Sequence, residues 1–349
     1  MIPVARGRRV TGGGPSRTPA VPVNRSDVLG AGRRRPMDVA LKDNRVQSGD
    51  RFLVSLHRTL RIPDDGRVYP LPPGFGLFPL RPASTIAPGP GLELIVPLYQ
   101  REALWLGFSA APWKPNAVKV IVGGVNAVSG LPDAATALGD PQDYLVCPDQ
   151  PWLDGFNAGG GVIRQFVAMP LGQGYGIEAG AGLPERGGLE IVVFDPKPGY
   201  FPDAPPPERL GPARPSRTAR PAEPREMALG ASGRMRQKIY PDTYGGAVWD
   251  QDNAGRVRIR ILNSHGWREL TKSEPPATPI DAAAYTAAGL PWFDLYDEQD
   301  RSVAPSDARK VKTVAEREQE LRIDSGNRSV DVPESQVVII DHRRREADP

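Results

Sequence analysis

The sequence holds one cysteine, Cys147, and three histidines. A single cysteine excludes an internal disulfide framework. Three histidines spread along the chain form no cluster with the spacing of metal ligands. We therefore expect no bound metal and no cofactor, and we expect a reducing, cytoplasmic environment.

Long apolar runs are absent as well. None approaches the roughly 18 residues that cross a bilayer, so no membrane span is predicted. The N-terminus has arginines but lacks the apolar segment of a secretory signal. Residues 1–50 carry ten Arg or Lys against four Asp, whereas the whole chain has a net charge of only +3. The excess positive charge thus belongs to a tail, and nucleic-acid binding by the folded part is not expected.

Glycine and proline are abundant, with 38 and 40 residues. Ten of the prolines fall in residues 195–226, a composition typical of an extended spacer. The sequence therefore predicts a disordered arm (1–37), a first module (38–194), a proline-rich linker (195–226), a second module (227–300) and a charged tail (301–349). Met37 is also a plausible start of the native chain.

The predicted fold class is mainly β. Segments of the first module such as "RFLVSLHRTLRIP", "NAVKVIVGGVNAV" and "GLEIVVFDP" alternate with a period of two between glycine and proline turns. This pattern is typical of a β-sandwich or jelly-roll. The second module is predicted to be small and β-rich with one helix in "TPIDAAAYTAAGLP", capped by Thr278 or Asp281. A helix and a returning strand, "SQVVIIDHR", are expected in the tail.

The stretch "VCPDQPWLDGFNAGGGVIRQF" (residues 146–166) is the first candidate for a ligand site. Trp152 offers a stacking surface, Asp154 and Asn157 offer hydrogen bonds, and Arg164 offers charge. The favoured alternative is structural. In it Trp152 is largely buried, Asp154 and Gly155 form a tight turn, and Cys147 ends a strand that faces the core.

A second candidate surface contains Trp249, Arg258 and Trp267, which form a basic strand flanked by aromatics and suit an acidic partner. The favoured alternative is again structural: arginines on the solvated face of a strand whose Val257, Ile259 and Ile261 face inward. The glycine-rich stretches "NAGGG" and "GQGYGIEAGAG" lack the lysine and the following helix of a phosphate loop. Turn glycines explain them better.

Three blocks carry a resemblance: "DPQDYLVCPDQPWLDGFNAGGGVIRQFVAMPLGQGYGIE", "MALGASGRMRQKIYPD…WD" and the following "TAAGLPWFDLYDE". The chain resembles an uncharacterised group of bacterial and fungal proteins that share these blocks in this order. In some of them a ubiquitin-like segment stands nearby, which this sequence lacks. The resemblance covers residues 39–298 and implies the two-module architecture, but it assigns no catalytic residues.

For function, the sequence favours a non-enzymatic binding or scaffolding protein that presents loops of a β-sandwich to a protein partner. One alternative is a hydrolase or transferase that uses dispersed carboxylates, such as Asp149 and Asp154 brought near Glu178 or Asp195. Another is a self-assembling structural component, because sheet edges offer unpaired backbone groups. No catalytic residue is assigned.

Overall fold

We describe the fold from a computed structural model of the chain. The residues described are 37–83, 91–133, 137–204, 226–277, 281–295, 302–305, 312–323 and 328–340. The expected N-terminal arm, most of the expected linker and the end of the tail lie outside them.

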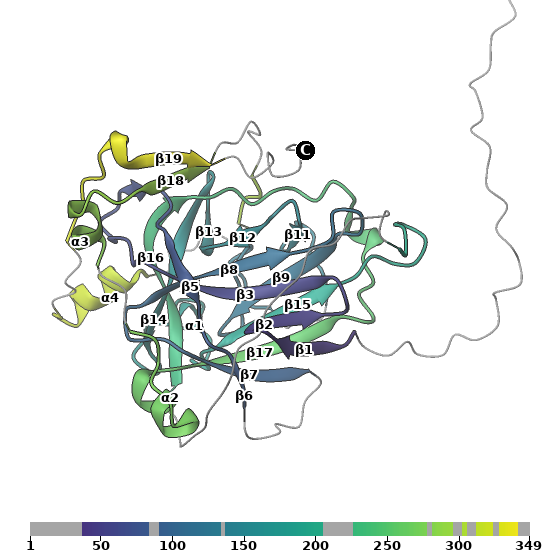
Figure 1. Cartoon of the computed structure of the whole chain (residues 1–349), viewed down its shortest axis with the longest axis horizontal. Coiled ribbons are helices and arrows are strands. Elements are labelled where there is room, and N and C mark those ends of the chain that lie inside the picture. Colours follow the sequence, from purple (N-terminus) through teal and green to yellow (C-terminus); the bar gives the residue numbers. More distant parts are fainter. Residues whose placement is uncertain are drawn as a thin grey trace, which may run out of the picture. The chain divides into compact units, whose positions relative to one another are not determined.

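The described residues form a mainly β structure, as predicted, with one large sheet and a small second one. The large sheet contains β1 (Val39–Lys42), β2 (Arg45–Ser48), β3 (Phe52–Thr59), β4 (Val68–Tyr69), β5 (Gly74–Leu77), β6 (Arg81–Pro82), β7 (Leu92–Pro97), β8 (Ala103–Ser109), β9 (Asn116–Val122), β10 (Val125–Asn126), β11 (Leu145–Cys147), β12 (Trp152–Leu153), β13 (Gly155–Gly159), β14 (Val162–Pro170), β15 (Leu189–Phe194), β16 (Glu226–Arg236) and β17 (Gly255–Leu262). The small sheet pairs β18 (Trp292–Leu295) with β19 (Val337–Ile340) in parallel, at the top of Figure 1.

The large sheet is continuous because each of its strands is hydrogen-bonded to at least one other strand of the sheet. From one side the order runs β1, β2, β3, β8, β14, β16, β17, β15, β9 and β11. Most pairs are antiparallel, and β4 with β16 and β7 with β17 are parallel. Strands from distant parts of the sequence therefore lie side by side (Figure 1).

The period of two in the sequence places the core. Alternate residues of strands from both predicted modules form one buried cluster, which includes Val54, Leu56, Leu104, Leu106, Val118, Val120, Ile191, Val193, Val257 and Ile259. In β17 the alternation is as predicted, since Val257, Ile259 and Ile261 are buried while Arg258 is exposed. Burial of this shared apolar face is the main stabilising contribution to the sheet.

The structure corrects the division into two modules. The first two strands of the expected second module form no separate sheet: β16 pairs with β14 over residues 162–170, and β17 lies between β15 and β7. The described residues from 37 onward belong to one compact unit. The proline-rich segment suggested a boundary because composition shows where a chain leaves a sheet. It does not show whether the chain returns to the same sheet.

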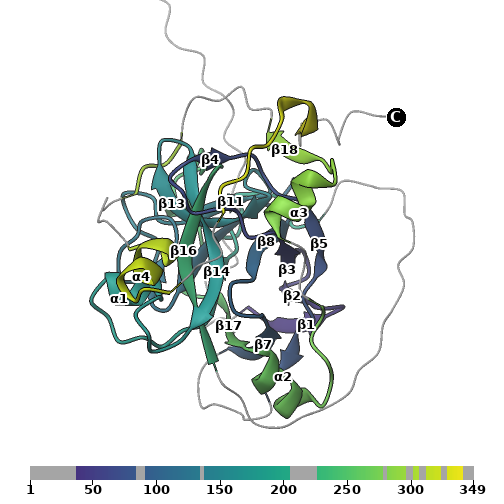
Figure 2. The same ribbon diagram turned by 90° about the vertical axis from the view of Figure 1, so that its left-hand side faces the viewer.

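Four α-helices lie among the described residues: α1 (Ile177–Gly180), α2 (Ser264–Thr271), α3 (Ala282–Ala287) and α4 (Val314–Glu320). Asp281 caps α3, one of the two caps predicted, and α4 is the helix expected in the tail. Helix α2 was not predicted. Asn263 caps it, and it packs beside β7 and β17 (Figures 1 and 2). Within this described part, no helix has the length and apolar composition to cross a membrane.

Because the two expected modules share one sheet, we expect that neither of them folds alone. A fragment of residues 37–204 lacks the strands that pair with β14, β15 and β7, so it should give no cooperative thermal transition by circular dichroism. Co-expression with residues 226–349 should restore that transition and yield a complex of the two fragments on gel filtration. A cooperative melt of 37–204 by itself would contradict the single-sheet arrangement.

Candidate binding surface on the outer sheet face

Three neighbouring strands bring five side-chain positions together on the face of the sheet that points away from the core. Ser55 of β3 lies opposite Gly107 of β8, and Trp152 of β12 lies opposite the same glycine. His57 lies opposite Trp105. Directly opposed residues share a face, so we call Ser55, His57, Trp105, Gly107 and Trp152 the outer-face patch.

A polar pair lies at the centre of the outer-face patch. Ser55 Oγ is 2.8 Å from His57 Nε2. A Cβ at Gly107 would lie 2.7 Å from that Oγ and 2.9 Å from that Nε2, so only glycine lets both side chains lean over β8. The His57 ring stacks on Trp105 at 3.7 Å between centroids, with an interplanar angle of 7°.

The environment of His57 keeps its ring neutral. Burial, together with the smaller effect of the positive charge of Arg45, lowers its pKa to about 4. A base of such low pKa accepts little of a proton at pH 7. In the described part of the chain, no carboxylate hydrogen-bonds to the His57 ring. The Ser55–His57 pair is therefore suited to hydrogen bonding with a ligand and poorly suited to activating Ser55 as a nucleophile.

Trp152 of the outer-face patch is partly buried, whereas the sequence predicted it to be largely buried. It packs against a second apolar cluster, which includes Ile163, Met235 and Trp292. Its side chain hydrogen-bonds to Asp154, and its carbonyl oxygen accepts from the side chains of Gln150 (3.1 Å) and Gln237 (3.2 Å). The indole is thus fixed while part of it stays open to solvent.

The side chain that hydrogen-bonds to the Trp152 indole, Asp154, is itself buried. It is 5% exposed, and burial raises its pKa to about 7, against the opposing effect of hydrogen bonds from Trp152 and Gln237. Among the described residues its Oδ2 atom has no hydrogen-bond partner. An ionised carboxylate is costly in such a place, so Asp154 is protonated in a large share of molecules near neutral pH.

The predicted tight turn at Asp154 and Gly155 is wrong. Asp154 instead connects β12 to β13, and Gly155 pairs with Gln165 of β14. A Cβ at Gly155 would lie 1.9 Å from the Arg164 carbonyl oxygen. A glycine is required at this position because two backbones approach closely. In the sequence alone, such a glycine cannot be told apart from a glycine that forms a turn.

Two other residues of the predicted ligand loop serve the fold. The Asn157 side-chain amide donates to the carbonyl oxygens of Val128 (3.1 Å) and Val303 (2.9 Å). Arg164 Nη1 lies 3.7 Å from Asp64 Oδ1. The prediction for Cys147 is confirmed: it ends β11, is fully buried in the core, and burial raises its pKa well above the ordinary value. A thiol in that state is a weak nucleophile.

The structure does not gather the second predicted surface. Trp249 is buried over the outer face of β9 and β15, and its Nε1 donates to Asp242 at 2.9 Å. Trp267 is buried against Ile95 and Leu262. Of the three, only Arg258 is exposed, and its guanidinium lies 3.7 Å from Glu190. Burial removes both tryptophans from any partner-binding role.

The carboxylates proposed for catalysis make separate contacts. Asp195 accepts from Arg51 (2.6 Å) and Asn116 (2.7 Å), whereas Glu178 accepts from the backbone of Gly187 (2.9 Å). Asp154 is engaged with Trp152 and Gln237. None of these contacts joins two of the three carboxylates Asp154, Glu178 and Asp195.

Ser55, His57 and Trp105 were missed at the level of sequence. The signal available was the alternation in "RFLVSLHRTLRIP", which puts Ser55 and His57 on one face. That β8, with Trp105, is the strand beside them is known only from the fold. Comparison of the chain with protein-family models, curated proteins and solved structures finds no match. The resemblance to the bacterial and fungal group therefore stays an expectation.

Asp154 makes stability depend on pH. Its folded pKa of about 7 lies above the ordinary 3.8, so the folded state holds a proton that the unfolded chain releases. Stability should fall as pH rises from about 4 to 7. Asp154→Asn should abolish most of this fall and exceed the wild type at pH 8 by about 2–4 kcal/mol. Urea unfolding at pH 4.5 and 8 measures both; equal pH dependence in the two proteins would contradict the burial of an acid here.

Proposed function

We propose that the protein is a non-enzymatic binding protein of the cytoplasm that engages a protein partner through the outer-face patch. The observation that carries this proposal is the fixed, half-open indole of Trp152 in one row with Gly107 and Ser55. Tryptophan and other large aromatic side chains are enriched among the residues that dominate the binding energy at the centres of protein interfaces. In this proposal the contact surface is a face of the sheet, whereas the sequence favoured the loops of the sheet.

The chemistry of the outer-face patch supports binding over catalysis. The neutral His57 ring and the Ser55 hydroxyl both donate and accept hydrogen bonds, which suits backbone and amide groups of a partner. Trp105 and Trp152 add apolar area on either side. Arg45 is the charged group that acts on His57, so the charge beside the pair is positive.

Trp152→Ala and Trp105→Ala should each weaken partner capture at least about tenfold, the loss typical of an interface hot spot. Each should cost only about 1–3 kcal/mol of stability, below the loss for a fully buried tryptophan. The test uses immobilised protein and quantitative mass spectrometry of what it retains from lysate.

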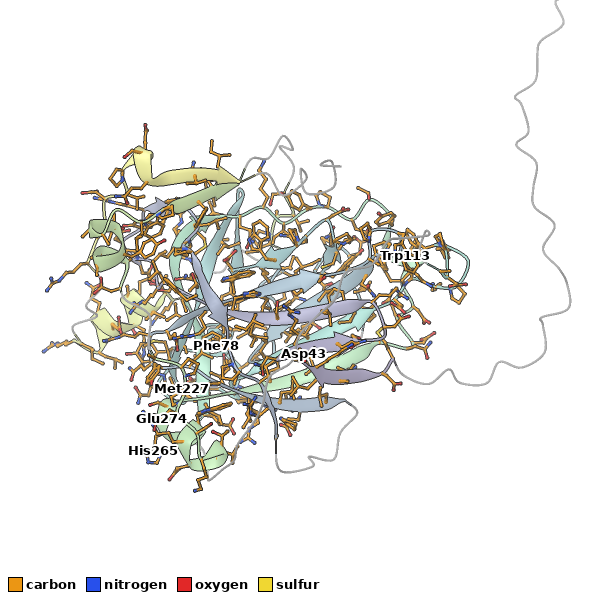
Figure 3. The ribbon with its side chains drawn as sticks, viewed as in Figure 1. Asp43, Phe78, Trp113, Met227, His265 and Glu274 are labelled. Atoms are coloured by element: carbon orange, nitrogen blue, oxygen red, sulfur yellow. The ribbon has the colours of Figure 1, made fainter. Side chains whose placement is uncertain are left out.

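Trp113→Ala is the matched control, because Trp113 is also half-buried and lies in the turn between β8 and β9, outside the outer-face patch (labelled at the right-hand side of Figure 3). It should retain the same proteins as the wild type. Equal capture by all the folded variants would contradict the outer-face patch as the contact surface.

Self-assembly is a second candidate function, and β19 is the observation that favours it. In the part of the chain described, β19 pairs only with β18. Val338 is 46% exposed and Ile339 is 67% exposed, so both faces of this edge strand present apolar side chains. Two identical apolar edges can pair antiparallel across a twofold axis. The partner that we consider for the β19 edge is therefore a second copy of the chain.

Light scattering over a range of protein concentrations tests self-assembly. The wild type should gain mass with concentration, and Ile339→Lys should stay monomeric because a charge on an edge strand blocks pairing. Leu290→Lys, which changes an exposed apolar residue outside the strands, should behave as the wild type. A wild type that is monomeric throughout would eliminate this candidate.

A further inference from the structure

Lys119 is a lysine enclosed by the protein at the middle of β9. It is 2% exposed, and both neighbours on the strand, Val118 and Val120, point into the core. Its own side chain lies on the other face, where Ile121 and Val192 belong to the buried apolar cluster around Trp249. A lysine is almost never this buried unless it is paired.

Two carboxylates meet the Lys119 ammonium group. Nζ lies 2.7 Å from Asp133 Oδ2 and 2.8 Å from Asp143 Oδ2, and it also contacts the carbonyl oxygen of Ala137. Both aspartates lie in the segment between β10 and β11. One amine nitrogen is therefore held within direct reach of two carboxyl groups.

The two aspartates differ in their other contacts. Asp133 Oδ2 also accepts a hydrogen bond from the Asn126 side-chain amide at 2.7 Å. Asp143 Oδ1 accepts from the Gly139 backbone N–H at 2.6 Å, while its Oδ2 faces the lysine. In Asp143 one oxygen is thus polarised by a fixed donor, and the other is placed beside the amine.

This arrangement favours a chemical reaction of the amine. An amide forms from a neutral amine and a neutral carboxylic acid, and the two carboxyl groups in contact with Nζ supply both an acid to react and a site for the displaced proton. A neutral amine is a nucleophile, and a neutral carboxylic acid is its electrophile. Holding the two in contact replaces a bimolecular encounter with an intramolecular one.

We infer that Lys119 and Asp143 form an intramolecular amide bond, with Asp133 carrying the proton. The Nζ lone pair attacks Cγ of protonated Asp143, and the Gly139 N–H stabilises the negative charge that develops on Oδ1. Asp133 takes a proton from Nζ and delivers it to Oδ2. The Cγ–Oδ2 bond then breaks and water leaves, so the step is a condensation without oxidant or reductant.

The bond would tie the centre of β9 to the segment that enters β11. These residues already lie beside each other, since β9 and β11 pair from Asn116 to Val118. The Lys119–Asp143 amide closes the intervening chain covalently, in a protein whose single cysteine forms no disulfide. This inference is independent of the proposed function and concerns the opposite half of the sheet system.

Intact mass spectrometry of the folded, full-length protein tests the bond. The wild type should weigh one water molecule less than its sequence requires. Lys119→Arg keeps a buried cation but supplies no ammonium, so it should have the full mass. Lys114 precedes a proline and a linked Lys119 resists trypsin, so the denatured wild type should yield one peptide of residues 102–164 that weighs one water molecule less than its sequence requires. An unlinked chain should instead yield the separate peptides 102–119 and 120–164.

Further variants separate the roles. Asp143→Ala should abolish the loss of water, and Asp133→Asn should abolish or markedly slow it. A full-mass wild type overturns the inference, and this result does not depend on whether any variant folds. A peptide joined at Asp133 would overturn the assignment of Asp143 as acceptor, as would full linkage in Asp143→Ala.

Discussion

The pairing of β14 with β16 is the interaction on which the remaining architecture depends. Register runs from Val162 opposite Arg236 to Pro170 opposite Met227, with a single irregularity. Through β16 and β17 this ladder connects the N-terminal strands to β15 and β9, and so closes the faces of the sheet around one core. In this arrangement the apolar residues of β3 and β8 share one core with those of β9, β15 and β17.

The local elements could be predicted from the sequence, and their arrangement could not. Alternation identified β3, β9, β15 and β17 together with their inward faces, since side chains of a strand point to opposite faces in turn. Register and partner choice depend instead on contacts between residues far apart in sequence. The proline-rich segment therefore suggested a domain boundary, although β16 after it pairs with β14 before it.

The candidate site illustrates the same limit at the level of single residues. Ser55 and His57 share a face for a reason visible in the sequence, but their relation to Trp105 and Trp152 depends on the pairing of β3, β8 and β12. Gly155 and Gly107 are conspicuous only as glycines. The structure shows that Gly155 allows two backbones to meet and that Gly107 makes room for Ser55 and His57. Neither role is that of a turn glycine.

The parallel pairing of β7 with β17 has a consequence for how the chain is made. Leu92 lies opposite Val257, so the partner strand leaves the ribosome more than 160 residues after β7. In that interval the apolar strand "LELIVP" presents an edge able to pair with other chains. Contacts of such long range also slow folding. During synthesis of this protein, the edge of β7 that β17 occupies therefore stays without its partner until β17 has been made.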